Sequence, residues 1–221
     1  MPKGVQVSGV TGTIWSGAIN SLTVQKRQLD SIRWQMHPWS LLTGSLDVDL
    51  TVGHRTSAVN GKANIDYSMA GITVNNLRFE APNQFVIGQS RLPFKTKIAG
   101  ESTLMLTEFK QGQPWCEQLN GKLFLTKTQV NNQFGDYPLG DIELKLTCQA
   151  GAIQISTDET MNKLGLVGQV DLADKSRVKL AAKIRSTATQ PADLQKALSF
   201  LGEPDAQGYY PINYNGRVPG L

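Results

Sequence analysis

The feature that most constrains the fold of this chain is an alternation of apolar and polar residues that recurs in one segment after another. Successive side chains of a β-strand point to opposite faces of a sheet, so a period of two predicts strands with one dry face and one wet face. The clearest segments are residues 32–36, 46–52, 63–69, 142–148, 164–172 and 178–184. One-sided alternation of this kind is typical of antiparallel sheets.

The stretches between these segments are rich in turn residues. Asn60-Gly61 and Asn120-Gly121 are the strongest hairpin signals, because both residue types tolerate positive φ. At Asn75-Asn76 the apolar phase shifts by one residue, which predicts a β-bulge or a tight turn. Pro38–Thr43 is expected to form one short helical turn, and Pro191–Leu201 carries an apolar stripe at helical spacing that predicts a short helix.

The expected fold is therefore all-β, with a single domain over residues 1–221. About ten to fourteen strands should form one large antiparallel sheet that is strongly twisted and curled, like an open barrel or a jelly roll, with one short C-terminal helix. A sheet with one dry face has to close on itself or stack on a second layer to bury that face.

The glycine-rich start of the chain is not expected to bind phosphate. Gly9, Gly12 and Gly17 fit no phosphate-loop spacing, and no helical stripe follows them. We expect Gly12 and Gly17 to shape a first hairpin instead. No nucleophile elbow, metal-binding helix or nucleotide fingerprint occurs elsewhere in the sequence. The sequence therefore predicts no enzymatic activity, no catalytic residues and no cofactor.

Metal and nucleic-acid binding are also not expected. The chain has two histidines and two cysteines, which are too few and too scattered for a zinc site. Its net charge is +4, and the lysines and arginines are spread along the sequence rather than clustered. A nucleic-acid-binding surface needs such clusters.

The two cysteines are Cys116 and Cys148. Cys148 continues an apolar alternation, so its thiol points to the dry face. Such a thiol is either a buried, inert side chain or one half of a disulfide. We expect the disulfide, which would tie the residues before Leu119 to the end of the strand around Ile142. A disulfide would also imply an oxidising compartment.

An aromatic cluster in the first fifth of the chain is the candidate interface. Trp34 alternates inward and is expected in the core, whereas Trp39 follows a proline in an expected turn. Exposed aromatic residues beside an arginine often mark an interface, although these residues could equally cap the edge of the core. The candidate residues are Trp15, Arg33, His37, Pro38 and Trp39.

Three stretches of the sequence carry a resemblance. They are VTGTIWSGAI (Val10–Ile19), LDSIRWQMHPWSLLTGSLDVDL (Leu29–Leu50) and FLGEPDAQGYYPINYNGRV (Phe200–Val218), about a quarter of the chain in total. Together they resemble the periplasmic domain of the type II secretion system protein N family. The resemblance implies an accessory, non-catalytic part of the machine that carries folded proteins across the outer membrane.

The resemblance also implies a location. Family members have a short cytoplasmic end, one transmembrane helix and then a periplasmic β domain. No apolar run in this sequence is long enough to span a bilayer, so the anchoring helix is expected to precede it. The chain is then expected on the periplasmic face of the inner membrane, in contact with other type II secretion proteins. Trp15 is expected near the membrane-proximal end of the domain.

Two functions remain open from the sequence. The chain is either an assembly component that contacts other secretion proteins, or a lipid-binding β groove that holds the acyl chains of phospholipid. An assembly component should fill its core with large side chains, whereas a lipid carrier should leave an apolar cavity. The expected core residues are Trp34, Tyr67, Phe79, Phe94 and the helix that starts at Pro191.

Overall fold

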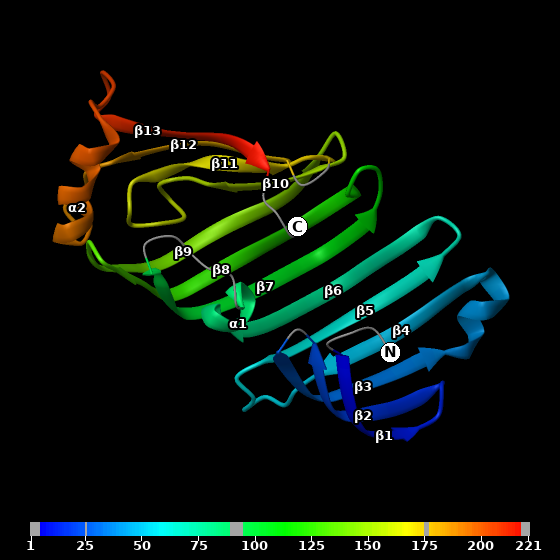
Figure 1. Ribbon diagram of the computed structural model, residues 1–221. Coiled ribbons are helices and arrows are strands. Elements are labelled where there is room, and N and C mark those ends of the chain that lie inside the picture. Colours follow the sequence, from blue (N-terminus) through cyan, green and yellow to red (C-terminus); the bar gives the residue numbers. More distant parts are fainter. Residues whose placement is uncertain (1–4, 25, 89–94, 175–176, 218–221) are drawn as a thin grey trace.

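The computed structural model describes residues 5–24, 26–88, 95–174 and 177–217, whose strands form one antiparallel sheet (Figure 1). Thirteen strands follow one another across this sheet in chain order. They are β1 (Val5–Gly12), β2 (Ser16–Val24), β3 (Arg27–His37), β4 (Ser45–Val52), β5 (Asn60–Ser68), β6 (Gly71–Pro82), β7 (Lys97–Gln111), β8 (Cys116–Asn132), β9 (Gly135–Gln149), β10 (Ala152–Thr157), β11 (Leu166–Leu172), β12 (Arg177–Arg185) and β13 (Tyr209–Arg217). The predicted all-β antiparallel fold is confirmed.

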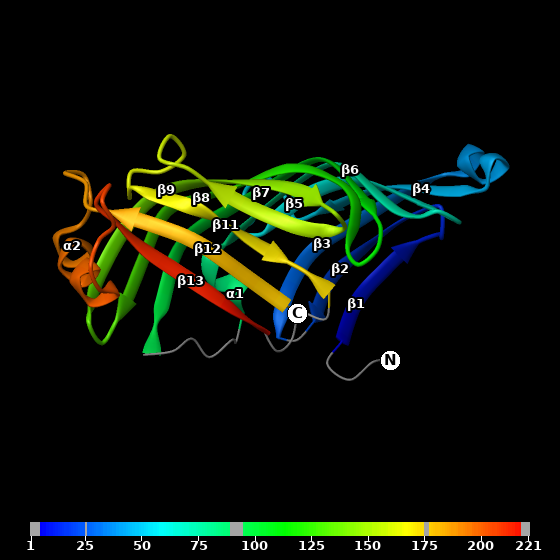
Figure 2. The same ribbon diagram turned by 90° about the horizontal axis from the view of Figure 1, so that it is seen from above.

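The sheet is strongly twisted and curls without closing. Seen from above, β1–β3 and β11–β13 bend toward the same side, and α1 (Asn83–Ile87) lies inside the curl (Figure 2). β1 and β13 do not pair with each other, so each leaves one strand edge open. The described strands all belong to this one sheet, so none of them forms a second layer. Neither closure nor stacking therefore buries the dry face, although the sequence led us to expect one of the two.

The inner face of the curl is apolar. α1 marks this face, because the Phe85 ring in α1 lies 6.3 Å from the Phe79 ring of β6. One inner row crosses seven strands from β6 to β12 in register: Leu77, Leu106, Gly121, Leu146, Ile155, Val170 and Leu180. The neighbouring outer row is mainly polar: Lys62, Arg78, Met105, Lys122, Lys145, Ser156 and Gln169. The alternation in the sequence thus separates an apolar inner face from a polar outer face.

Two glycines inside strands make room for large side chains on the inner face. A Cβ atom at Gly17 would collide with the Trp34 ring, and a Cβ atom at Gly121 would collide with the Leu106 side chain. Close approach of a neighbouring side chain is a common reason for glycine within a strand. These positions are therefore constrained by packing across strands.

The predicted turns have mixed outcomes. The hairpin turns expected at Asn60-Gly61 and Asn120-Gly121 are wrong, because β5 begins at Asn60 and β8 runs through the second pair. The irregularity expected at Asn75-Asn76 is present: the register of β5 and β6 shifts there, and Asn76 has a φ of 51°. The short turn expected at Pro38–Thr43 is also present, as the 3₁₀ helix η1.

Little of the chain is buried. Its accessible surface is 14242 Å², whereas a compact protein of this mass exposes about 10,000 Å². Ten apolar side chains are buried among the described residues, and eight of them lie between residues 116 and 198. The ten are Ile32, Ala81, Cys116, Leu119, Ile142, Leu146, Leu164, Val178, Ile184 and Leu198. Most of the inner face is therefore only half-buried.

The expected aromatic core is only partly formed. Trp34 and Phe79 are half-buried on the inner face. Tyr67 was expected in the core, and this prediction is wrong, because its side chain is 59% exposed. Tyr67 pairs with Ile72 where their row reaches the end of the sheet, so few neighbours screen it from water. Phe94 lies outside the described residues.

The expected C-terminal helix is present as α2 (Ala192–Leu198), which continues into the 3₁₀ turn η4 (Ser199–Leu201). Leu198 is its buried residue, with 3% of its surface exposed. Before the helix, the Gln190 side chain donates hydrogen bonds to the Leu164 and Arg185 carbonyls and accepts one from the Thr187 amide. Gln190 thereby ties the start of α2 to the adjacent end of the sheet.

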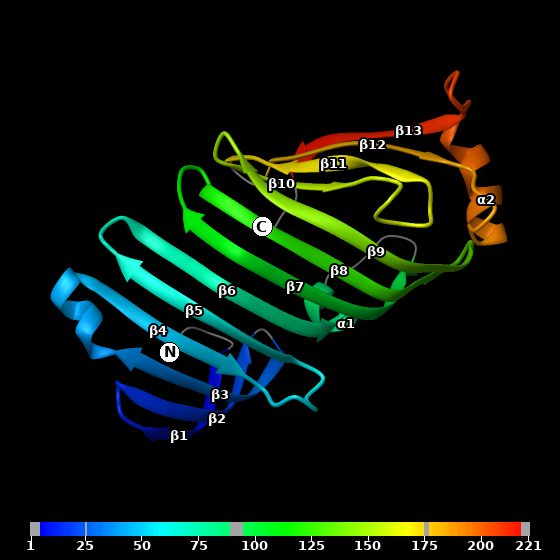
Figure 3. The same cartoon turned by 180° about the vertical axis from the view of Figure 1, so that it is seen from behind.

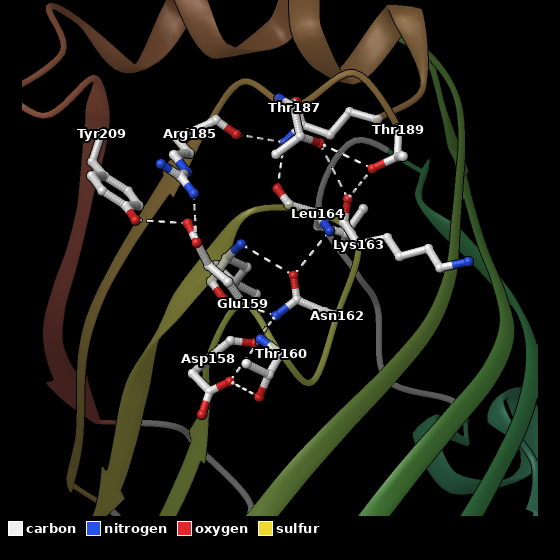
Figure 4. A network of polar contacts seen from close by, with 12 residues as sticks. Asp158, Glu159, Thr160, Asn162, Lys163, Leu164, Arg185, Thr187, Thr189 and Tyr209 are labelled. Carbon is white, nitrogen blue, oxygen red and sulfur yellow. Dashed lines mark hydrogen bonds and ion pairs between the residues drawn. The ribbon is translucent and has the colours of Figure 1, made fainter.

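The connection between β10 and β11 is organised around one buried side chain, Asn162 (Figure 4). Its amide nitrogen donates to the Asp158 and Leu166 carbonyls, and its oxygen accepts from the Leu164 and Leu166 amides. Asn162 is 8% exposed, so few of these groups could bond to water instead. In the same network, Glu159 accepts hydrogen bonds from a tyrosine and an arginine that lie further along the chain: Tyr209 and Arg185. The network fastens this connection to the last two strands.

Candidate functional site

Four of the five candidate interface residues lie at one end of the sheet, where the β1–β2 turn, η1 (Pro38–Thr43) and the β5–β6 turn are found (Figures 1 and 3). Trp15 is in the β1–β2 turn, Arg33 and His37 are in β3, and Pro38 and Trp39 begin η1. The Met36 amide donates a hydrogen bond to the Trp15 carbonyl (2.7 Å), which fixes the β1–β2 turn against the end of β3. The structure thus brings Trp15, His37, Pro38 and Trp39 to one end of the sheet and leaves Arg33 further along β3.

η1 presents apolar side chains to solvent on a backbone that is firmly held. The Ser40 hydroxyl donates to the His37 carbonyl (2.7 Å) and accepts from the Asp47 amide (3.1 Å), so it links η1 to β3 and β4. Trp39 is 80% exposed and Leu42 is 79% exposed. Packing in the core therefore does not explain why these two positions carry large apolar side chains.

The β5–β6 turn lies beside η1 and adds further exposed apolar side chains. Ser45, just after η1, pairs with Ser68, just before the turn. Met69, in the turn, is fully exposed. We use the name apolar tip for the exposed large apolar residues of η1 and of this hairpin, namely Trp39, Leu41, Leu42, Tyr67, Met69 and Ile72.

The outer face beside the apolar tip is acidic. Asp47 and Asp66 are directly opposite each other on β4 and β5, and Asp49 lies two residues further along β4. The Asn64 amide donates to Asp47 and Asp49, and His37 Nε2 lies 2.8 Å from the Asp49 carboxylate. This hydrogen bond raises the pKa of His37 and lowers the pKa of Asp49. We name Asp47, Asp49 and Asp66 the acidic cluster; one imidazole cannot neutralise all three.

Trp15 and Arg33 are set apart from the apolar tip. Arg33 faces outward opposite Thr51, four residues before His37, which is roughly 13 Å along the strand. Trp15 is 44% exposed in a turn at the far end of β1 from Val5. Trp15 therefore lies at the opposite end of the β1–β2 hairpin from Val5.

A disulfide joins Cys116, at the start of β8, to Cys148, near the end of β9. Cys116 is 1% exposed, and Cys148 is half-buried. The Trp115 indole donates to the Ala173 carbonyl (2.8 Å), which connects the β7–β8 turn to the turn after β11. The disulfide and this hydrogen bond fasten the C-terminal part of the sheet rather than the apolar tip.

A separate apolar hollow of about 600 Å³ lies between the β8–β9 turn and α2. Its lining residues are Phe134, Tyr137, Asp193, Lys196, Ala197 and Phe200. The Lys196 ammonium lies 3.6 Å from the Asp193 carboxylate, so the two charges of the lining are paired. This hollow suits an apolar group, but its paired charges select no particular ligand.

In the ranges that the structure describes, no group of three or more histidine, cysteine, aspartate or glutamate side chains could hold a metal ion. No helix in the described part of the chain is long and apolar enough to cross a membrane. The described tip is apolar in η1 and the β5–β6 turn, and the outer face of β4 and β5 beside it is acidic.

Reasoning from the sequence found Trp39 but missed most of the apolar tip. Leu41 and Leu42 follow no alternation, so periodicity gave them no role, whereas Met69 ends the alternating segment 63–69 and was expected on the dry face. One signal was present: residues 38–46 and residues 67–74 contain no charged side chain. Only the pairing of β4 with β5 brings these two uncharged stretches together.

Comparisons with known proteins agree along almost the whole chain. A family model described as Type II secretion system (T2SS), protein N matches residues 3–213. A type II secretion system protein N of Aeromonas hydrophila is 32% identical over 98% of this chain and 86% of its own length. Relatives of the same description in Vibrio cholerae and Pectobacterium carotovorum are 26% and 22% identical, each over 99% of this chain and over 87% and 86% of their own lengths. No solved structure matches the chain significantly.

Proposed function

We propose, from the premise that this chain belongs to the type II secretion system protein N family, that it is a non-catalytic accessory component of that machinery. In this proposal residues 1–221 form a single periplasmic domain that contacts other secretion proteins. An N-terminal helix outside this sequence anchors the domain to the inner membrane. The observation that carries the proposal is the match to the family over nearly the full chain.

Two features of the molecule support the proposed setting. The disulfide between Cys116 and Cys148 suits the oxidising periplasm, where such bonds persist. The apolar tip exposes large apolar side chains to water, which is unfavourable in free energy, and a binding partner that covered them would remove this cost. Both features fit a periplasmic domain that works within an assembly.

Affinity purification of the full-length protein tests this proposal. The tagged protein would be expressed from its own locus in cells with a complete type II secretion machinery, solubilised in mild detergent and analysed by quantitative mass spectrometry. We expect other secretion proteins to be enriched over a tagged, unrelated inner-membrane protein. Equal recovery of secretion proteins in the two samples would contradict the proposed membership of the assembly.

A second candidate function, the binding of phospholipid acyl chains, is favoured by the inner face. This face is a continuous apolar surface with rows such as Leu77 to Leu180, and most of it is only half-buried. Burial of apolar surface contributes about 25 cal/mol per Å², so an uncovered face of this extent gains much from any apolar cover. The polar outer face of a second copy would not provide an apolar cover for the inner face. Flexible acyl chains can do so, because they can follow a curved surface.

Native mass spectrometry of gently purified protein tests this second candidate. Leu123 and Phe124 are adjacent in β8 and point to the inner and the outer face respectively. If the inner face holds acyl chains, phospholipid should co-purify with the wild type and with Phe124→Gln, and much less with Leu123→Gln. Wild-type protein without lipid, or equal loss in the two variants, would rule out this candidate.

A further inference from the structure

We propose that the apolar tip is a docking surface for another protein, whose matching site is an apolar pocket bordered by lysine or arginine side chains. This inference rests on the proposed function, which requires contacts with other secretion proteins, and it specifies the chemistry of one such contact. The tip and the acidic cluster are adjacent, because η1 leads into β4, which carries Asp47 and Asp49, and Asp66 in β5 is followed by the turn that holds Met69.

The large apolar side chains of the tip are exposed to solvent. Trp39, Leu42 and Met69 are 80%, 79% and 105% exposed, so the isolated fold gains little from them. Tryptophan and other large apolar side chains at the centre of an interface contribute most of its binding energy. A cluster drawn from two neighbouring turns, with no charge in residues 38–46 or 67–74, is the arrangement of such a centre.

The backbone that carries the exposed side chains of η1 is held in place by hydrogen bonds, which also favours binding. The Ser40 hydroxyl holds η1 to the His37 carbonyl and the Asp47 amide. Gly44 ends η1 in the left-handed region, at a φ of 77°, and returns the chain to β4. A surface that is ordered before binding loses less conformational entropy when a partner arrives. The exposed side chains are therefore presented on a preformed backbone.

The acidic cluster carries negative charge that its neighbours compensate only in part. Asp47 and Asp66 are directly opposite each other, a pairing of like charges that destabilises a sheet. Asn64 and His37 bond only to Asp47 and Asp49. Among the described residues, no hydrogen bond or ion pair reaches the Asp66 carboxylate. Cationic side chains on a partner would offset this repulsion, and complementary charge around an apolar centre fixes the orientation of binding.

The same charges argue against the other occupants. A bilayer surface with anionic phospholipid repels carboxylates, and segments that lie on membranes usually carry lysine and arginine beside their apolar residues. A second copy docked tip to tip would place two acidic clusters side by side, because a two-fold contact uses the same patch twice. A different protein with basic residues avoids both conflicts.

Site-specific photocrosslinking tests the docking surface in cells. A benzophenone amino acid would replace Leu42 in the full-length protein, produced in cells with the complete secretion machinery, and crosslinked products would be identified by mass spectrometry. Phe200 is the matched control position, because it is 89% exposed and apolar but lies beside α2. We expect one secretion protein to crosslink at position 42 at least five-fold more strongly than at position 200.

The charge requirement is tested in the same cells with Asp47→Asn and Asp66→Asn combined. This variant should lower the crosslink yield at position 42 several-fold, because the basic border loses its counterpart, while the protein level and melting temperature do not fall. Equal crosslinking at positions 42 and 200, or a yield that does not respond to the two substitutions, would overturn the inference. A crosslink between two copies of this chain at position 42 would also overturn it.

Two further readouts separate the alternatives. Flotation with vesicles of phosphatidylethanolamine and phosphatidylglycerol should leave the protein unbound; binding that is lost in Trp39→Ala would assign the tip to the membrane instead. The affinity purification described above reports on the proposed function independently. Secretion proteins recovered there, without a crosslink at position 42, would refute the docking surface alone. Their absence from both experiments would refute the proposed function as well.

Discussion

The two halves of the sheet are built from the same alternating pattern but are stabilised very differently. In β8–β13 and their connections, buried residues, a disulfide and the Asn162 network hold the layer together. In β1–β6, Ile32 and Ala81 are the apolar residues that reach full burial among those described. The first half is therefore a single layer with few buried side chains. The second half is stabilised by buried side chains, a disulfide and a hydrogen-bond network.

This difference connects stability with the proposed function. The apolar tip, the acidic cluster and all five residues that the sequence marked as a candidate interface lie in β1–β6 or its turns. A surface that must bind a partner has to leave apolar side chains uncovered, and each uncovered side chain adds little to the stability of the isolated fold. We infer that the C-terminal half supplies the stability that allows the N-terminal half to stay exposed.

The largest effect is expected from the disulfide. Replacement of Cys116 and Cys148 by serine should lower the free energy of unfolding by about 3.5 kcal/mol, since the bond closes a loop of roughly thirty residues. Urea unfolding followed by tryptophan fluorescence measures this loss. A loss of unfolding free energy below about 1 kcal/mol would mean that the stability of the C-terminal half does not depend on the disulfide.

A somewhat smaller effect is expected from the Asn162 network. Asn162→Ala should cost about 2–3 kcal/mol, because it leaves the Leu164 and Leu166 amides and the Asp158 carbonyl without partners in a buried site. Asn162→Asp keeps the accepting oxygen and loses the donor, so its cost should differ from that of alanine. Thermal unfolding of the three proteins gives the comparison; an unchanged midpoint for Asn162→Ala would contradict the role assigned to this residue.

The opposite result is expected in the N-terminal half. Trp39→Ala combined with Leu42→Ala should change the stability of the isolated chain by less than about 0.5 kcal/mol, because both side chains are already in water. The same urea titration measures it. If this variant lost as much stability as the Asn162 variant, the apolar tip would be part of the core and the contrast between the two halves would fail.

The smallest effect concerns the pH dependence of the His37–Asp49 pair. The hydrogen bond raises the folded pKa of His37 above its usual 6.5, so its contribution is complete below that pH and is lost as the pH rises through the folded value. The folded pKa of Asp49 is lowered from 3.8, so its contribution is present above that value and is lost as the pH falls through the folded one. The pair therefore contributes most to the stability of the folded chain between pH 3.8 and pH 6.5, the ordinary pKa values of the two groups.

NMR titration of the His37 ring measures this pair directly. Asp49→Asn should bring the pKa of His37 down toward its usual value, because the strongest cause of the rise is removed. A pKa that does not move in this variant would show that the contact does not persist in solution. Since both side chains are largely exposed, the accompanying change in stability should be small.

Sequence reasoning predicted the strands well because their signal is local. The alternation around Leu46 and Ile142 depends only on neighbouring residues and on the two-residue period of a strand. Asn120-Gly121 was mistaken for a turn, because the reason for Gly121 is the Leu106 side chain on the adjacent strand. Such a reason cannot be read from a local pattern.

The candidate site was predicted only in part for a similar reason. Trp39 and Pro38 are recognisable as an exposed turn, but Tyr67 alternates with its strand and so looks like a core residue. Its exposure depends on where the strand ends in the sheet and on what lies over it. The acidic cluster likewise arises from the register of β4 with β5, which places Asp47 opposite Asp66.

Hydrogen exchange followed by mass spectrometry tests the central claim most directly, because it compares the two halves within one molecule. Local opening depends on buried contacts, so amides in β2–β6 of the isolated chain should exchange at least ten-fold faster than those in β8–β12. The measurement on the wild-type protein needs no variant and no partner. Equal protection in the two halves, or slower exchange in β2–β6, would contradict the claim that the exposed half depends on the stability of the other.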